Sequence, residues 1–456
     1  MLDPTRDWQP RLRAAVAIAL VAIVLATALT YSRALGRGKS AFVRWQPQIL
    51  AMFEGADVYV ASDRPAYPNP PLMGVLLYPL AALPVEAGAW LLFALKVVLA
   101  ALAVAFALEA VAPRGPPLPA PWAIAGIALS LRPILSDLQH GNVNILIFFL
   151  LMAGLRALQQ GRDTAAGLWV ALATALKVTP ALHLAYFVWK RWWRACAAFA
   201  ASAVVFTLLP GVALGFDRLA QLLAGFYGAM LEPYSVEGVV LHTEESNQSL
   251  GAVLHRYLTD QASIELRSGN AAFNVVSLDL DTVQWILRGL AVALVVALGV
   301  VCRAPGSTRD LRIASEYALV LIAMLAISPR SWKHHYVVMA LPYLCVMAWA
   351  VRPGWRGWQR PLVAVIAASQ LFVLSTSRDF AKLAWFVDEA HKWAQGLGAY
   401  LVSAVVVMVA LAAALLEAVR RSAGRSPRDP CWSASRQGDG AEHLHEEADG
   451  ADPWGY

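Results

Sequence analysis

Long apolar blocks dominate this chain and constrain its fold more than any other feature. Most of them approach the length of about 20 residues that a helix needs to cross a bilayer. Their approximate limits are 14–31, 71–84, 88–111, 120–133, 145–158, 164–177, 180–190, 195–214, 283–302, 312–327, 335–351, 361–376 and 398–419. The chain has 59% hydrophobic and only 15% charged residues. A soluble domain of this size would need more charged side chains to cover its surface. The sequence therefore predicts an all-α, polytopic integral membrane protein.

The placement of Lys and Arg between these blocks predicts the topology. Basic residues cluster around 6–13, 190–194, 303–312, 352–360 and 420–425. Since cytoplasmic loops carry the excess of basic residues, both termini should be inside and the polar stretches at about 32–70 and 216–280 outside. An odd number of blocks cannot leave both termini inside, so one block does not cross. The short blocks 71–84 and 120–133 are the candidates, each giving roughly 20 Å of helix against a core of about 30 Å. We expect about 12 transmembrane helices, with external loops that carry short helices.

The remaining composition narrows the class of protein. The net charge of +6 arises from basic residues at the ends of apolar blocks, so no nucleic-acid partner is expected. The four cysteines have no paired spacing, which argues against a disulfide framework and a zinc site. One membrane domain is expected over 1–421. The tail 422–456, rich in Gly, Ser, Asp, Glu and Pro, is expected to be disordered in the cytoplasm.

Five polar clusters stand out, and the inferred topology places all of them on the outer side. They are Tyr67–Pro71, Asp137–Asn144, Lys177–Pro180, Glu244–Ser249 with Arg256, and Ser328–Tyr336. A rigid turn, a helix cap or a snorkelling lysine explains each one singly. Polar groups at membrane depth are costly unless paired, however, and a protein that only packs has no reason to gather them on one face. That face is the predicted active site. His334 and His335 have no third ligand nearby, so neither a metal ion nor another cofactor is expected.

Basic residues in the first external loop depart from the charge rule. Arg33, Arg37, Lys39 and Arg44 lie where that rule disfavours them. Contact with anionic headgroups explains them, and so does a site for a phosphate-bearing ligand at the membrane surface. The residues alone leave both explanations open.

Several motifs resemble, in order, those of glycosyltransferase family 87. They are Gly55–Tyr59 with Tyr67–Pro71, Gly141–Asn144, Leu176–Pro180 with Arg191–Arg194, Asn247–Leu250 with Arg256, and Ser328–His335. The resemblance spans about 33–350. It implies a GT-C-like enzyme of the inner (plasma) membrane whose active face is extracytoplasmic. Such an enzyme is a hexosyltransferase that moves a sugar, mannose in related enzymes, from a polyprenyl-phosphate donor to an outer lipid or glycan acceptor.

The resemblance also implies roles for the polar residues. Cations and a histidine that would bind the donor phosphate are Arg44, Lys177, Arg256, Arg330, Lys333 and His334. Amides that would bind the substrates are Asn69, Asn142, Asn144, Asn247 and Gln248. The sugar, the acceptor and the oligomeric state stay open.

One departure from the family concerns the general base, the group that takes the proton of the acceptor hydroxyl. Family members often carry an Asp early in the first external loop, but Ser40–Gln46 holds no acid here. Asp137 is favoured instead because its polar neighbours are hardest to explain structurally, and His335 would assist it or bind the donor phosphate. Further candidates are Asp57, Asp63, Glu244 and Glu245.

Two other functions fit the apolar blocks. A transporter or a flippase for a lipid-linked sugar would also have many helices and basic residues, but transporters usually show two related halves and charges at the midplane. The sequence shows no internal repeat, and its polar clusters lie at the ends of the apolar blocks. A non-catalytic scaffold would make the convergence of the clusters a coincidence, so we rank it last.

Overall fold

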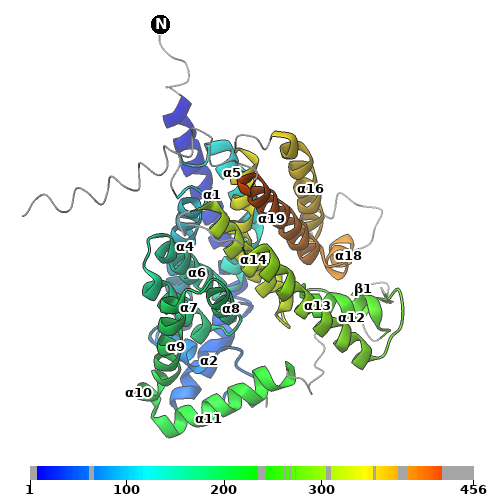
Figure 1. The fold of residues 1–456 in the computed structure, drawn as a ribbon. Coiled ribbons are helices and arrows are strands. Elements are labelled where there is room, and N and C mark those ends of the chain that lie inside the picture. The colour runs from blue at the N-terminus through cyan, green and yellow to red at the C-terminus, as the bar shows by residue number, and fades with distance from the viewer. Residues whose placement is uncertain are drawn as a thin grey trace, which may run out of the picture.

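The computed structural model describes residues 8–60, 66–113, 116–234, 243–260, 263–266, 269–272, 274–303, 310–352, 356–377, 380 and 389–423. Asp63 and residues 424–456 of the predicted tail lie outside the described residues. The described chain is almost entirely helical (Figure 1). This agrees with the helical class that the apolar blocks predict.

The first half of the chain builds one side of a helical bundle (Figure 1). Its elements are α1 (Trp8–Leu35), α2 (Ala41–Phe53), α3 (Pro71–Ala81), α4 (Val85–Val111), α5 (Ala120–His140), α6 (Asn144–Gln159), α7 (Asp163–Leu176), η1 (Thr179–Ala181), α8 (Leu182–Trp189), α9 (Trp193–Leu208) and α10 (Pro210–Leu214). Helices α4, α6, α7 and α9 pack in a row, each against the next. Pro210 separates α9 from α10 because it has no N–H for the helical ladder.

The second half supplies the central helices and the longer of the two loop regions that the sequence predicts to be external. Its elements are α11 (Phe216–Phe226), η2 (Tyr227–Leu231), η3 (Glu232–Tyr234), α12 (Leu250–Leu258), β1 (Ser263–Leu266), β2 (Gly269–Ala272), α13 (Leu280–Val301), α14 (Leu311–Ile327), η4 (Lys333–Met339), α15 (Ala340–Ala350), α16 (Arg356–Ser375), α18 (Ala390–Gly396) and α19 (Ala399–Ala423). Strands β1 and β2 form an antiparallel hairpin that pairs Ser263 with Ala272. The hairpin was not expected from the sequence.

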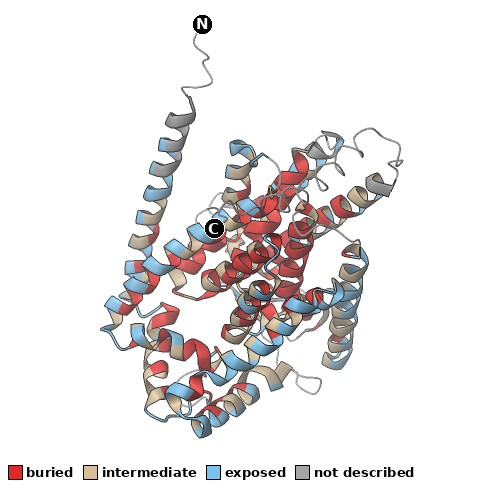
Figure 2. Ribbon diagram, turned by 60° about the vertical axis from the view of Figure 1, so that its left-hand side comes forward, coloured by how far each residue is buried: buried red, intermediate tan, exposed pale blue. Residues whose placement is uncertain are grey.

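The core lies around α14 and α15. Nearly every side chain of these two helices is buried, and Figure 2 shows buried residues concentrated at the centre of the bundle. A helix that is apolar all round belongs inside a large helical assembly. Helices α5 and α19 pack against α15, and α16 packs against α19. The core therefore supports η4, the short helix that connects α14 to α15.

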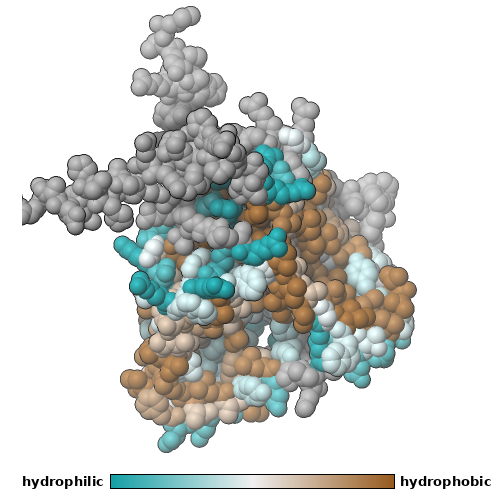
Figure 3. Space-filling view, in the orientation of Figure 1, coloured by the Kyte–Doolittle hydropathy of each residue, from teal (hydrophilic) through white to brown (hydrophobic). Residues whose placement is uncertain are grey.

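The outer helices carry their apolar residues on the surface. Five helical segments in the described part of the chain are long and apolar enough to cross a membrane: Ile18–Leu35, Val85–Val111, Trp193–Leu214, Leu280–Val301 and Ala399–Arg421. Figure 3 shows hydrophobic residues covering wide areas of one face of the molecule. This supports a membrane-embedded protein, because lipid leaves apolar side chains exposed. The expected count of about 12 crossings is not confirmed.

Helix α5 extends well beyond its predicted end. The apolar block 120–133 suggested about 13 residues, whereas the helix runs from Ala120 to His140. Proline removes one N–H from the ladder without ending a well-packed helix, so α5 continues past Pro133. The helix ends at Gly141, which has a φ of 61° and lies so close to the Ser40 hydroxyl oxygen that a Cβ would clash with it. Asp137 and His140 therefore belong to the last helical turns rather than to a loop.

Candidate active site

Helix η4 is the centre of the candidate site, because three cavities open around it. The first, of about 750 Å³, lies between η4, α5 and α18. The second, of about 20 Å³, lies between η4, α6, α7 and α14. The third, of about 340 Å³, lies between η4, α2 and the turn after α5. Lys333 and Gln395 line both the first and the third cavity, so these two adjoin. We call them the 750 Å³ cavity and the 340 Å³ cavity.

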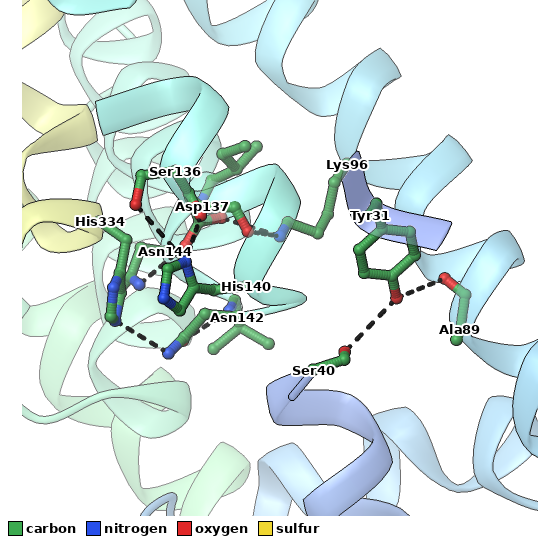
Figure 4. A network of polar contacts seen from close by, with 12 residues as sticks. Tyr31, Ser40, Ala89, Lys96, Ser136, Asp137, His140, Asn142, Asn144 and His334 are labelled. Carbon is green, nitrogen blue, oxygen red and sulfur yellow. Dashed lines mark hydrogen bonds and ion pairs between the residues drawn. The ribbon is translucent and has the colours of Figure 1, made fainter. Parts of the chain in front are cut away.

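A buried ion pair lies beside the end of α5. The Asp137 side chain is fully buried, and its Oδ2 lies 3.0 Å from Nζ of Lys96, a residue of α4 (Figure 4). The Lys96 ammonium also donates to the Asp137 backbone carbonyl at 2.5 Å. Asn144 donates to Oδ1 of Asp137 at 2.9 Å, and the Ile145 N–H donates to Oδ2 at 3.3 Å. Both carboxylate oxygens are therefore engaged, and they fix the orientation of the Asn144 amide.

Lys177 continues this network on the other side of Asn144. Its ammonium donates to Oδ1 of Asn144, so the amide connects Lys177 to Asp137. Lys177, Asn144 and His335 line the 20 Å³ cavity, which has room for about one water molecule. The structure thus brings these three predicted residues together, in a space too small for a phosphate.

The 340 Å³ cavity holds most of the other predicted residues. Its polar lining includes Arg44, Asn142, Gln248, Lys333 and His334. The Asn142 amide donates to Nε2 of His334 at 3.2 Å (Figure 4). The ring of His140 stacks on that of His334 with centroids 5.1 Å apart. Two cations and several neutral hydrogen-bonding groups therefore face one space, which suits an anionic ligand that carries hydroxyl groups.

Two histidines, His140 and His334, line this cavity, and the surroundings of His334 favour its neutral form. Burial, followed by the charges around it, holds the pKa of His334 well below the usual value. Neutral His334 offers a ring nitrogen rather than a full charge. Arg44 and Lys333 are therefore the positive charges of the 340 Å³ cavity.

Besides the enclosed Asp137, four further predicted residues lie outside the linings of all three cavities. Asn247 joins two loops, since its amide donates to the Pro329 carbonyl at 3.0 Å and accepts from the Ser331 N–H at 2.9 Å. Asn69 is buried, and its carbonyl accepts from the Tyr59 hydroxyl. Arg330 lies over the Tyr234 ring at 6.0 Å. Their roles in substrate binding stay predictions.

The fourth, Arg256, holds the external loop together. Its Nε donates to the Gly396 carbonyl at 2.8 Å, and its Nη1 donates to the carbonyls of Glu244 and Asn247, both at 3.0 Å. Burial lowers the pKa of Arg256 to about 10, which leaves it charged at neutral pH. A buried guanidinium with these partners fastens the loop 243–249 to α18.

Replacing Arg256 by Met should lower the free energy of unfolding by about 2–3 kcal/mol, because several buried carbonyls lose their donor. The Arg256→Lys variant keeps the positive charge but lacks the planar guanidinium group with its several N–H donors. It should therefore recover only part of the lost stability. Thermal unfolding of the purified protein in detergent measures both changes. Weaker binding of a polyprenyl-phosphate sugar to a fully stable Arg256→Lys protein would instead support the predicted role in phosphate binding.

Contacts join four of the five predicted polar clusters, as a common side of the membrane requires. The Asp137–Asn144 cluster contacts Lys177 through Asn144 and His334 through Asn142. The Glu244–Ser249 cluster contacts the Ser328–Tyr336 cluster, where Gln248 N–H donates to the Ser331 carbonyl at 2.7 Å. In the first cluster, Tyr67 packs against Trp45 of α2 and donates its N–H to the Val58 carbonyl, and the Asn69 backbone carbonyl accepts from the Tyr59 hydroxyl.

Two charged residues next to the site, Lys96 and Arg132, were not predicted from the sequence. Lys96 lies inside the apolar block 88–111, and a charged residue within such a block was itself a signal. Arg132 lies at the end of the block 120–133 and lines the 750 Å³ cavity. Neither belongs to a polar cluster, and the predicted site was built from the polar clusters alone.

The carboxylates proposed as the general base differ in their access to the cavities. Glu245 lines the 750 Å³ cavity, whereas Asp137 is enclosed by its partners. Glu244 accepts a hydrogen bond from the Trp332 indole at 3.3 Å, and Asp57 accepts one from the Tyr59 N–H at 3.0 Å. In the first external loop, Ser40 begins α2 and is buried.

Comparisons with known proteins place the chain in a family. The profile of glycosyltransferase family 87 matches residues 67–329. A polyprenol-phosphate-mannose-dependent alpha-(1-2)-phosphatidylinositol mannoside mannosyltransferase from Mycolicibacterium smegmatis is 28% identical over 49% of this chain and 46% of its own length. The protein of the same name from Mycobacterium tuberculosis is 29% identical over 66% of this chain and 64% of its own length. The chain thus matches only about half to two thirds of the length of these relatives.

A solved structure shows a weaker similarity. Crystalline ArnT from Cupriavidus metallidurans bound to undecaprenyl phosphate is 15% identical, with a TM-score of 0.42, over 95% of this chain and 81% of that chain. The family assignment rests instead on the profile, which covers more than half of the chain and includes the predicted motifs from Tyr67 to Pro329. The chain belongs to glycosyltransferase family 87.

Proposed function

We propose that this protein is a GT-C-like hexosyltransferase that moves mannose from a polyprenyl-phosphate donor to a lipid or glycan acceptor on the outer face of the plasma membrane. Membership of glycosyltransferase family 87 and the names of the two mycobacterial relatives support the donor. The apolar helices support a site at a membrane surface. A phosphatidylinositol mannoside is the acceptor to test first, because the relatives are named for it.

The observation that carries this proposal is the pair of adjoining cavities around η4. The 340 Å³ cavity presents Arg44, Lys333 and neutral His334 to one space. The 750 Å³ cavity adjoins it and shares Lys333. Two substrates that react with each other need neighbouring sites, and a lipid phosphate needs cations. A donor site and an acceptor site that meet at Lys333 satisfy both requirements.

The reaction forms one bond and breaks one. The acceptor hydroxyl oxygen bonds to the anomeric carbon of the sugar, the bond from that carbon to the phosphate oxygen breaks, and its electron pair leaves with the phosphate. Arg44 and Lys333 would stabilise the negative charge that develops there. The amides of Asn142 and Gln248 line the same cavity and would orient the sugar.

The proton of the acceptor hydroxyl needs a base within hydrogen-bond reach. Glu245 meets this requirement best, because it lines the 750 Å³ cavity. Asp137 has both oxygens engaged by Lys96, Asn144 and Ile145, a geometry suited to a positioning residue. We propose Glu245 as the base and Asp137 as the residue that orients Asn144, with Lys177 and His335 at the far end of that network. The sequence favours Asp137 as the base, and variants of Glu245 and Asp137 tested side by side distinguish the two assignments.

The protein reconstituted in liposomes with a labelled polyprenyl-phosphate mannose and a phosphatidylinositol mannoside should form a larger labelled glycolipid. The Arg44→Gln variant should raise the KM for the donor about tenfold or more, because a charge-assisted contact to the phosphate contributes about 1.5–3 kcal/mol. Arg37→Gln is the matched control, since Arg37 is exposed in the same loop. If the donor KM of Arg44→Gln is unchanged, Arg44 does not bind the donor phosphate.

The same liposomes distinguish the transporter alternative. A flippase would move the labelled donor from one leaflet to the other without forming a new glycosidic bond. Movement of intact donor, with no product for any acceptor offered, would overturn the transferase proposal.

A further inference from the structure

The 750 Å³ cavity contains one cation, Arg132, that the proposed donor site does not explain, beside Lys333, which both cavities share. Arg132 on α5 and Lys333 on η4 both line it, together with Glu245, Lys392, Thr376 and Gln395. A volume of this size falls in the range of small-molecule sites and is large enough for a lipid headgroup that carries sugars. The cavity lies beside the proposed donor site rather than within it.

Arg132 is held ready for an additional ligand. Its Nε donates to the Tyr400 hydroxyl at 2.8 Å, and its Nη2 donates to the Thr376 hydroxyl at 2.9 Å. These two neutral partners fix the guanidinium plane without neutralising its charge. A preorganised fork loses little entropy when it binds a phosphate or a carboxylate. In the described part of the chain, Arg132 forms no ion pair with an acidic side chain.

Lys333 reinforces the positive charge. Burial, followed by repulsion from Arg132, lowers the pKa of Lys333. Two like charges close enough to repel each other are unfavourable unless an anion lies nearby. Among the described residues Lys333 has no acidic partner either. Lys392, by contrast, is paired with Glu389 at 3.2 Å. The unpaired positive charge that lines this cavity is therefore concentrated on Arg132 and Lys333.

We propose that the 750 Å³ cavity is the acceptor site and that Arg132 and Lys333 bind a phosphodiester group of the acceptor. This inference rests on the proposed transferase function and specifies its acceptor as an anionic phospholipid that carries a sugar or polyol. With the phosphodiester on Arg132, a hydroxyl of the same headgroup lies in the cavity that Glu245 lines. Lys333, shared by both cavities, would contact both phosphates and hold the two substrates side by side.

Kinetics with two acceptors test the proposal. The protein in liposomes is given a phosphatidylinositol mannoside or a neutral glycolipid with the same terminal mannose. Arg132→Gln should raise the KM for the anionic acceptor about tenfold or more, and leave the KM values for the neutral acceptor and the donor unchanged. Lys333→Gln should raise the KM for both the anionic acceptor and the donor. Arg162→Gln is the control, since it removes one exposed charge from the turn between α6 and α7.

Two kinetic outcomes would overturn the acceptor assignment. If Arg132→Gln raises the donor KM alone, the phosphate on Arg132 belongs to the donor. If it changes no KM in a variant that unfolds at the wild-type temperature, Arg132 binds no substrate. The Arg132→Lys variant controls for misfolding, because it keeps the positive charge. Its KM for the anionic acceptor should lie between those of Arg132→Gln and wild type, and its KM values for the neutral acceptor and the donor should equal those of wild type.

A binding measurement separates this inference from the proposed function. Calorimetry of the full chain in detergent uses soluble glycerophosphoinositol, inorganic phosphate and a short-chain polyprenyl phosphate as probes. Wild type should bind glycerophosphoinositol at least tenfold more tightly than Arg132→Gln does, and more tightly than it binds inorganic phosphate. If wild type shows this binding but transfers no sugar, the transferase proposal fails and the phosphodiester site stands. Equal binding by wild type and Arg132→Gln rejects the site.

Discussion

Replacing Glu245 by Gln should reduce sugar transfer by about 10²–10⁴-fold, the usual contribution of a positioned general base. The reason is geometric: Glu245 is a carboxylate that lines the 750 Å³ cavity beside Lys333 and Arg132. Gln keeps the size and polarity of the side chain but cannot take a proton. The loss should appear in kcat, with the KM for the donor nearly unchanged. Initial rates in liposomes at saturating donor measure it.

Two further variants make this result decisive. Glu244→Gln is the matched control, because a Gln oxygen can still accept the hydrogen bond from the Trp332 indole, so it should stay within a fewfold of wild type. Asp137→Asn tests the other candidate. If a folded Asp137→Asn protein loses kcat while Glu245→Gln keeps it, the base is Asp137 and the proposed division of roles is reversed.

The membrane class followed from the sequence because lipid imposes a simple rule. A helix in hydrocarbon must be long and apolar, so its limits can be read from residue types alone. The block 88–111 became α4 (Val85–Val111), and the block 312–327 became α14 (Leu311–Ile327). Residue types are a poorer guide to the limits of a helix that is surrounded by other helices rather than by lipid. Helix α5 packs against η4 and α15, and its last turns contain the polar residues Ser136, Asp137, Gln139 and His140, so composition alone ended that helix too early.

The site was predicted in part, for a related reason. Clusters of polar residues at helix ends identified η4 and the turn after α5, and these do line the cavities. The sequence could not show which polar side chains face a cavity and which hold loops together. Arg44 and Arg256 look equivalent as cations in external loops. One lines the 340 Å³ cavity, and the other donates to backbone carbonyls of the chain. Only the tertiary packing distinguishes them.

Lys96 is a second residue whose role could not be predicted from the sequence. A lone lysine within an apolar block gives no indication of its partner, which lies 41 residues away at the end of α5. The pair joins α4 to α5 at the point where Asp137 orients Asn144. The charges that matter for the site are therefore a product of the packing between these two helices.

Replacing Lys96 by Met should lower the free energy of unfolding by about 3–5 kcal/mol, because it leaves the Asp137 carboxylate buried without its counter-charge. The double variant Lys96→Met with Asp137→Leu should recover most of this loss, since an apolar pair of similar volume often replaces a buried ion pair at no net cost. Thermal unfolding in detergent measures both. As a control, Arg156→Gln breaks the exposed Arg156–Glu109 pair and should cost less than about 1 kcal/mol.

Activity of the double variant then shows why a buried ion pair lies at this position. If the pair only stabilises the fold, restored stability should bring restored sugar transfer. We expect the stable double variant to remain inactive, because a leucine side chain in place of Asp137 cannot accept the hydrogen bond from Asn144, and Asn144 then no longer holds the Lys177 ammonium. A double variant with full stability and full activity would reduce Asp137 to a structural residue. The burial of charge beside the cavities is thus expected to serve orientation, with its stabilising effect confined to balancing the two charges.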